Sequence, residues 1–310
     1  MDRKIIDIGM RCLYRNPRRQ NARVLARFPA AGLFAALLFA APLRAATGAP
    51  PAAVTLAQSD PARLVQQVCA NEIQNFSRSR PPLRYTLRKV TAKSDTTKQI
   101  VETRQGGVAR LIALGGEPLD PPQQRLEDER LEKVRDDPAV EAHRRQMEER
   151  DRARIIHLTR ALPQAFIYRY AGTVDSPEGL LIHLSMTPNP QWTPPDFESR
   201  ILTGVHGEML IDATTLRVQR VEGHVFRDVD FGWKVLGVLY PGGEILFEQA
   251  PTACCGWQLS RLRLHLNGKA LMLKPIRIDV RESAFDYCHT PQGWGYRRAA
   301  QWLLGPAPQG

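Results

Sequence analysis

The chain of 310 residues has few of the features that metal centres and phosphate-binding loops need. Its five cysteines contain no C-x-x-C spacing, which would let two thiolates converge on one zinc ion. No glycine-rich loop follows an expected strand and opens a helix, so nucleotide binding is not indicated. The sequence therefore predicts neither a cofactor nor a metal ion.

Long apolar runs are also missing after residue 45. The apolar stretch at residues 28–43, FPAAGLFAALLFAAPL, is shorter than the ~20 residues that a helix needs to cross a bilayer. It follows a basic segment and precedes small residues, the order typical of a secretory signal peptide. We therefore expect residues 1–46 to be a signal peptide, and the mature chain to be periplasmic or secreted, without a transmembrane segment. A retained anchor is the less favoured alternative.

Positive charge is concentrated in the same N-terminal segment. The chain has a net charge of +11, and residues 1–46 hold nine Arg or Lys against two Asp. Only about +4 remains in the mature part, less than the basic footprint expected of a nucleic-acid-binding protein. No nucleic-acid partner is predicted.

Residues 47–59, TGAPPAAVTLAQS, are rich in Pro and Ala and are predicted to be a linker. A helix is predicted to follow, with Asp60 as its N-cap and Pro61 in its first turn. Its apolar residues recur on one helical face, which predicts a core stripe of Val65, Cys69, Ile73 and Phe76.

From Leu83 the apolar residues alternate with polar ones, which indicates successive half-buried strands. Asn267–Gly268 and Pro241–Gly242–Gly243 have the composition of hairpin turns. Short connections predict antiparallel pairing, and a sheet of about ten strands tends to curl. We therefore predict a mainly β (α+β) fold for residues 60–290, a curved antiparallel sheet or unclosed half-barrel around the N-terminal helix.

Residues 118–164 interrupt the strand pattern with nearly balanced charges. Asp120 and Asp137 each precede a proline, which indicates two helix starts and a charged helical-hairpin insertion. Its charges are typical of a solvated face, and the alternative is a docking surface for a partner. Residues 291–310 are predicted to be a C-terminal tail.

The cysteines and one aromatic group are the other candidate sites. Export favours disulfides, and we expect Cys254 or Cys255 to bond to Cys288. Cys69 is expected to be a buried thiol, with a disulfide as the alternative. The aromatic residues Phe231, Trp233 and Tyr240 either pack in the core or form the lip of a binding site.

Catalytic patterns are weak. Asp228 and Asp230 are close in sequence, but a carboxylate pair also needs a defined spatial separation. Cys288 and His289 are adjacent, so on an extended chain they point to opposite sides. We predict a protein that is not an enzyme.

The segment GEMLIDATTLRVQRVEG at residues 207–223, together with the helix and the long series of strands, resembles the lipoprotein-carrier superfamily of the LolA and LolB type. The resemblance implies a half-barrel whose concave face accepts lipid acyl chains. It predicts a non-enzymatic periplasmic carrier for a lipid or a lipidated protein. The alternative is an exported scaffold with a filled core, whose helical insertion docks an envelope protein.

The N-terminal pattern yields a first testable prediction. Intact-mass measurement of the exported protein should give a mature chain that starts within a few residues of Ala46, because small residues follow the apolar run there. A mature chain that retains residues 28–41 would contradict the secretory interpretation.

Overall fold

The computed structural model describes residues 51–77, 80–231, 237–270 and 274–305. All of them belong to one compact unit of the chain. The predicted signal peptide at residues 1–46 lies outside the described residues, as does Trp233. Among the described helices, none has the length and apolar character needed to span a membrane.

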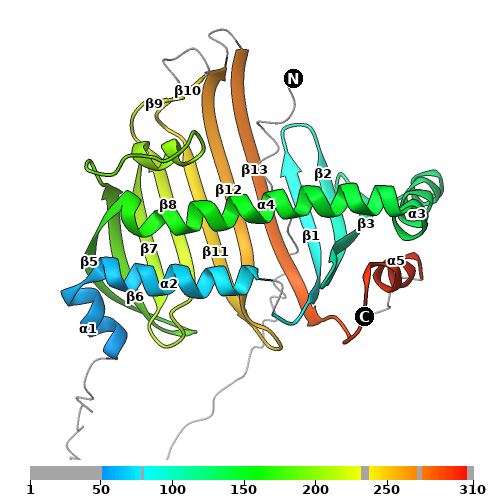
Figure 1. The fold of residues 1–310 in the computed structure, drawn as a ribbon, viewed down its shortest axis with the longest axis horizontal. Coiled ribbons are helices and arrows are strands. Elements are labelled where there is room, and N and C mark those ends of the chain that lie inside the picture. The colour runs from blue at the N-terminus through cyan, green and yellow to red at the C-terminus, as the bar shows by residue number, and fades with distance from the viewer. Residues whose placement is uncertain (1–50, 78–79, 232–236, 271–273, 306–310) are drawn as a thin grey trace, which may run out of the picture. The chain divides into compact units, whose positions relative to one another are not determined.

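The described strands form one antiparallel sheet (Figure 1). They are β1 (Leu83–Thr91), β2 (Asp95–Thr103), β3 (Gly106–Leu114), β4 (Glu117–Pro118), β5 (Phe166–Ser176), β6 (Gly179–Pro188), β7 (Val205–Asp212), β8 (Val218–Val225), β9 (Val229–Asp230), β10 (Gly237–Leu239), β11 (Glu244–Thr252), β12 (Gly256–Ala270) and β13 (Lys274–His289). Their order is β4-β3-β2-β1-β13-β12-β11-β8-β7-β6-β5, with β9 and β10 off this path. The sheet is open, so the predicted unclosed antiparallel sheet is confirmed.

The helices are α1 (Ala52–Ser59), α2 (Pro61–Phe76), α3 (Pro121–Asp136), α4 (Pro138–Ala165) and α5 (Tyr296–Leu304), with a 3-10 helix η1 (Ser199–Gly204). The predicted N-cap at Asp60 and the two predicted helix starts at Asp120 and Asp137 are confirmed. Asp60 accepts a hydrogen bond from the backbone N–H of Arg63, and Asp120 forms a capping box with Gln123. Asp137 accepts from two backbone N–H groups of α4. Each aspartate thus satisfies N–H groups that a helix start leaves without partners.

Two segments predicted to be irregular contain helices. The predicted linker includes α1, which buries Val54 and Ala57 in the main core, because its alanines favour a helix once an apolar surface is near. The predicted tail includes α5, which buries Ala299, Ala300 and Leu303. These side chains pack with residues of β2, β3 and α3 in a second core cluster.

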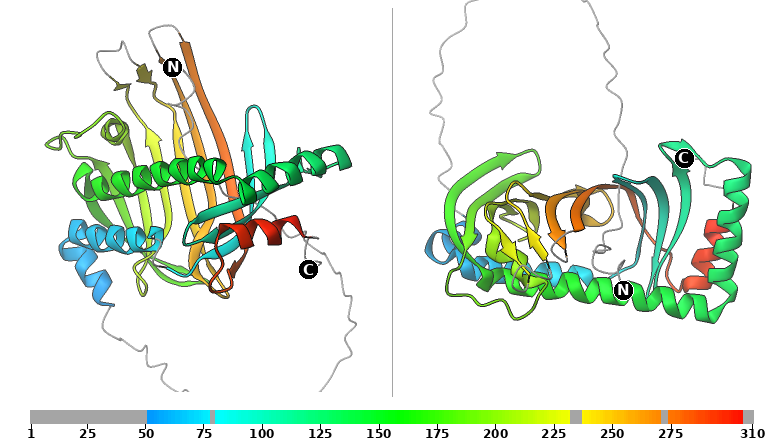
Figure 2. Two further views of the ribbon diagram at one scale, coloured as in Figure 1. Left: turned by 45° about the vertical axis from the view of Figure 1, so that its right-hand side comes forward. Right: turned by 90° about the horizontal axis from the view of Figure 1, so that it is seen from above.

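The charged insertion forms two consecutive helices that meet at a corner rather than an antiparallel hairpin (Figure 2). Asp137 alone separates α3 from α4, which is too short a link for the second helix to turn back along the first. α4 then runs across the open side of the arc formed by the strands, and its backbone approaches β3 at one flank and β5 at the other.

Several charges of α4 bind backbone groups of other elements, so this helix is more than a solvated face. Glu148 accepts a hydrogen bond of 2.8 Å from the backbone N–H of Gly107, and Arg144 donates to the carbonyl of the same residue. Arg152 donates to the carbonyl of Phe76 at the end of α2. Three ionic side chains therefore hold α4 against the β2–β3 turn and α2.

The buried side of α2 differs from the predicted stripe. It consists of Leu64, Val65, Val68, Cys69 and Glu72, whereas Ile73 and Phe76 are half-buried. The prediction was right for Val65 and Cys69 and wrong in omitting Glu72, because the apolar pattern gave no reason to place a carboxylate in the core.

The Glu72 carboxylate is held by donors from β8, from β11 and from Arg217, which directly precedes β8. The Arg217 side chain donates from Nε at 2.9 Å and from Nη2 at 3.2 Å. The backbone N–H of Val218 donates at 3.0 Å and the Gln249 amide at 2.9 Å. A buried carboxylate is tolerated when its charge and lone pairs are satisfied in this way. The network seats α2 on β8 and β11.

Both predicted hairpin turns were wrong. Asn267 and Gly268 lie inside β12, where they pair with Arg277 and Ile276 of β13. Residues 240–243 separate β10 from β11, and both of these strands pair with β12, so this segment is a bulge along one edge of β12. Glycine is common in turns, but it also occurs inside strands where two backbones approach closely. Gly268 is such a case, because an added Cβ would collide with the carbonyl oxygen of Val238.

The Glu72 network generates a prediction about stability. Glu72→Ala should lower the free energy of unfolding by about 2–4 kcal/mol, because it leaves the Val218 N–H without an acceptor and removes the carboxylate that compensates the Arg217 charge, which keeps only Gln249. Urea denaturation measures this, with Gln67→Ala on the exposed side of α2 as the matched control, expected to change the free energy by less than ~0.5 kcal/mol. Equal effects of the two changes would contradict a stabilising role for the network.

Candidate functional site: the inner face of the sheet

The side of the sheet that packs against α1 and α2 is here named the inner face. Directly paired residues of neighbouring strands point to the same side, so the pairings trace rows of side chains across this face. One row crosses six strands and is apolar throughout: Tyr170, Leu184, Met209, Val221, Phe247 and Leu262. The inner face therefore presents continuous apolar surface from β5 to β12.

A second row runs beside the first: Tyr168, Met186, Gly207, Gly223, Ile245, Leu264 and Val280. Gly207 and Gly223 are paired directly, so no side chain covers the inner face at these two positions. An added Cβ at Gly207 would collide with the backbone of Glu222, which explains why a glycine is needed there.

The helices cover the inner face unevenly. Side chains of α1 and α2 join those of β5 to β8 in the main core cluster, and the buried residues of that flank include Ile182, Leu184 and Met209. The enclosure of the middle strands is mixed, because Leu262, Leu264 and Leu266 of β12 are buried, whereas Ile245, Phe247, Ile278 and Val280 are half-buried.

An ion pair ends the first row. Leu262 pairs with Glu282 of β13, and Glu282 pairs with Lys89 of β1. The Lys89 ammonium lies 2.9 Å from the Glu282 carboxylate, whose side chain is fully buried. The first row thus ends in an ion pair where β13 meets β1, while Leu87 and Ala284 beside it continue the apolar surface on the same face.

Phe231 and Tyr240, two residues of the predicted aromatic lip, contact different partners. The ring of Phe231 packs on Phe197 with centroids 4.9 Å apart, at the edge of the main core. The ring of Tyr240 lies 5.8 Å from the Lys269 ammonium. Trp233 lies outside the described residues. Sequence reasoning missed Phe197 and Phe226, which are 40% and 46% exposed, because neither belongs to an aromatic cluster in the sequence.

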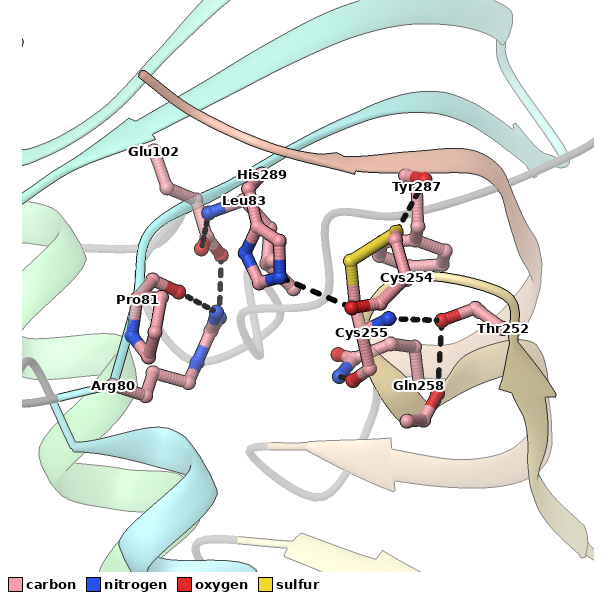
Figure 3. Close-up of a disulfide and its surroundings, with 11 residues drawn as sticks. Arg80, Pro81, Leu83, Glu102, Thr252, Cys254, Cys255, Gln258, Tyr287 and His289 are labelled. Carbon is pink, nitrogen blue, oxygen red and sulfur yellow. Dashed lines mark hydrogen bonds and ion pairs between the residues drawn. A yellow bond between two sulfur atoms is a disulfide. The ribbon is translucent and has the colours of Figure 1, made fainter. Parts of the chain in front are cut away.

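The cysteines do not pair as predicted (Figure 3). Cys254 and Cys255 form a disulfide with each other, while Cys288 is an exposed free thiol. Cys69 is a buried free thiol, as expected. Burial, reinforced by the charge of Glu72, raises its pKa to about 12. Burial likewise raises the pKa of the neighbouring Tyr168 well above its ordinary value.

Each weak catalytic pattern contains a group that binds elsewhere in the chain. His289 Nε2 donates to the carbonyl of Cys254 at 3.0 Å, so this nitrogen is not a base for the Cys288 thiol. The backbone carbonyl of Asp230 accepts from Arg200. Within the described part of the chain, no group of three His, Cys, Asp or Glu side chains is arranged to hold a metal ion.

Comparison with known proteins gives limited similarity. No protein-family model matches the chain, and no curated protein matches it. Among solved structures, the chain is similar to a domain from Vibrio parahaemolyticus described as an outer membrane lipoprotein-sorting protein, with a TM-score of 0.31 and 10% identity, covering 79% of this chain and 100% of that chain. It is also similar to a DUF1329 family protein from Desulfovibrio piger, with a TM-score of 0.26 and 9% identity, covering 76% of this chain and 95% of that chain. Neither structure assigns a ligand or a residue role to this chain.

The raised pKa of Cys69 generates a prediction about pH. Cys69 keeps its proton in the folded protein up to about pH 12, whereas the unfolded chain loses it near the ordinary value of 9.0. The folded state therefore binds more protons between these values, and the free energy of unfolding should decrease as the pH rises through this range.

Urea denaturation at several pH values measures this decrease in the wild type and in Cys69→Ala. The variant should show a shallower decrease, because the titrating thiol is gone. Identical pH dependence in the two proteins would show that Cys69 ionises normally when folded.

Proposed function

We propose that the protein is a non-enzymatic carrier or binding protein for an apolar ligand, a lipid or a lipidated protein. The observation that supports this proposal is the apolar inner face, which extends beyond the flank packed by α1 and α2. At the middle strands Ile245, Phe247, Ile278 and Val280 keep part of their surface accessible.

Burial of this surface supplies the binding energy. Each methylene group of an acyl chain that leaves water contributes about 0.8 kcal/mol, without a directional requirement. A strand row such as Phe247 and Leu262 suits a linear chain, because it offers apolar contacts at the regular spacing of neighbouring strands. The proposal needs no catalytic group.

The proposed position of the ligand is the middle of the sheet, between the flank covered by α2 and the Glu282–Lys89 ion pair. α4 crosses this side of the sheet and would lie over the ligand. Phe231 and Tyr240 are proposed to border its entrance, since both flank the short β9 and β10 strands at one end of the sheet. Periplasmic location belongs to the same proposal, whereas an envelope protein docked on the helical insertion belongs to the alternative scaffold function.

Two neighbouring residues of β11 provide a matched test. Phe247 pairs with Val221 and Leu262 on the inner face, whereas Leu246 pairs with Glu222 and Arg263 on the opposite face. Both side chains are half-buried. Phe247→Ala should weaken the binding of a fluorescent long-chain fatty acid about tenfold or more, and Leu246→Ala should leave it nearly unchanged.

The readout is fluorescence titration, with native mass spectrometry of the protein purified from its own periplasm to detect co-purified lipid. Urea denaturation of both variants separates lost binding from lost folding. Equal binding by Phe247→Ala and wild type, or a wild type that carries no lipid and binds no fatty acid, would contradict the carrier function and favour a scaffold with a filled core.

A further inference from the structure

The pairing between β12 and β13 stops before the strands end. Their backbone pairs run from Ala270 with Lys274 to Arg261 with Ser283. Beyond this point β13 continues to His289 beside β1, and β12 begins at Gly256 beside β11. Within the described residues, the ladder between these two neighbouring strands is therefore open at this end.

Side-chain contacts bridge the open end. The hydroxyl of Tyr287 donates to the carbonyl of Leu259 at 2.9 Å. His289 Nε2 donates to the carbonyl of Cys254. The β11–β12 turn, which carries the Cys254–Cys255 disulfide, thus lies against the last residues of β13 (Figure 3).

The Cys254–Cys255 disulfide lies close to the backbone of Cys288, which is a free thiol. The Sγ of Cys254 is 3.0 Å from the carbonyl oxygen of Tyr287, and this sulfur has no hydrogen to donate while it is in a disulfide. That carbonyl belongs to the peptide bond leading into Cys288, whose Cα is about 2.8 Å from the oxygen by standard backbone dimensions. Cys254 Sγ therefore lies within about 6 Å of the Cα of Cys288. Tyr287 and His289 both contact this turn, so the Cys288 side chain between them starts on the other side of β13, and bond formation requires the end of β13 to turn toward Cys254.

We propose that Cys254, Cys255 and Cys288 form a thiol–disulfide exchange site. The Cys288 thiolate attacks Cys254 Sγ, a bond forms between Cys288 and Cys254, and the Cys254–Cys255 bond breaks. The electron pair of the broken bond leaves on Cys255, which takes up a proton in place of the one lost by Cys288. One disulfide and one thiol are present before and after, so the isomerisation needs no oxidant or reductant.

The two disulfide isomers link different segments of the chain. The Cys254–Cys255 bond lies within one turn, whereas a Cys254–Cys288 bond would join that turn to β13 across the open end of the ladder. Both Cys254 and Cys288 are exposed, so small thiols and disulfides have access to the site.

Two variants test which sulfur is in reach. Cys255→Ser leaves Cys254 with Cys288, and the matched Cys254→Ser leaves Cys255 with Cys288. With oxidised glutathione as the oxidant, the intramolecular cross-link should form about tenfold faster in Cys255→Ser, because Cys254 is the sulfur beside the Tyr287–Cys288 peptide. Equal rates, or no cross-link in either variant, would overturn the proposal.

The wild-type protein tests the exchange itself. Incubated at about pH 8.5 without oxidant, alkylated after an acid quench and digested with trypsin, it should yield a disulfide between the peptide holding Cys254 and Cys255 and the peptide holding Cys288. Alkylation should appear on Cys255. Complete alkylation of Cys288, with the Cys254–Cys255 bond intact at all times, would overturn the proposal, and so would bonding of Cys288 only to a second chain.

Discussion

The burial of the Glu72 carboxylate determines how the N-terminal helix sits on the sheet. A charge removed from water costs several kcal/mol unless partners replace the lost hydration, and Glu72 receives four hydrogen bonds from Arg217, Val218 and Gln249. These donors come from Arg217 directly before β8, from β8 and from β11, more than 140 positions away in the sequence. Because the geometry of several bonds must be satisfied together, α2 has one favoured position, and the apolar side chains around Val65 and Val68 are placed with it.

The helices cover different faces of the sheet. α1 and α2 pack on the inner face at the β5–β8 flank, while α3 and α5 join Val101 and Val108 on the opposite face of β2 and β3. α4 links the two flanks, and its ionic contacts to Gly107 and Phe76 anchor it at the far side. On the middle strands, Ile245, Phe247, Ile278 and Val280 remain half-buried.

The polar groups of the inner face lie at the margin of its apolar rows. The Glu282–Lys89 pair sits where β13 meets β1, next to Leu262 in the same row. Under the proposed carrier function, an acyl chain there would have to desolvate charged groups, whereas the two rows traced from β5 to β12 offer apolar contacts. The ion pair would therefore set one limit of the ligand site.

Cys254, Cys255 and Cys288 lie at the open end of the β12–β13 ladder. The proposed exchange would therefore alter how the β11–β12 turn and β13 are held together, independently of the apolar rows.

Local signals in the sequence determined several features directly. Asp60, Asp120 and Asp137 start their helices because an aspartate side chain caps backbone N–H groups within its own turn. The alternation that begins at Leu83 determined the strands, since period-two burial needs only that one side of the sheet meets a core. These features depend on neighbours a few residues away.

Only the tertiary structure decided the rest. Nothing near Glu72 in the sequence indicates its burial, because its donors come from distant strands. Asn267–Gly268 has the composition of a turn but is extended, because β10 and β13 pair with it on both sides. The disulfide formed within the Cys254–Cys255 pair, although Cys288 was the expected partner. Composition and periodicity describe a residue and its near neighbours, whereas partner choice depends on which distant groups the folded sheet brings within a few ångströms.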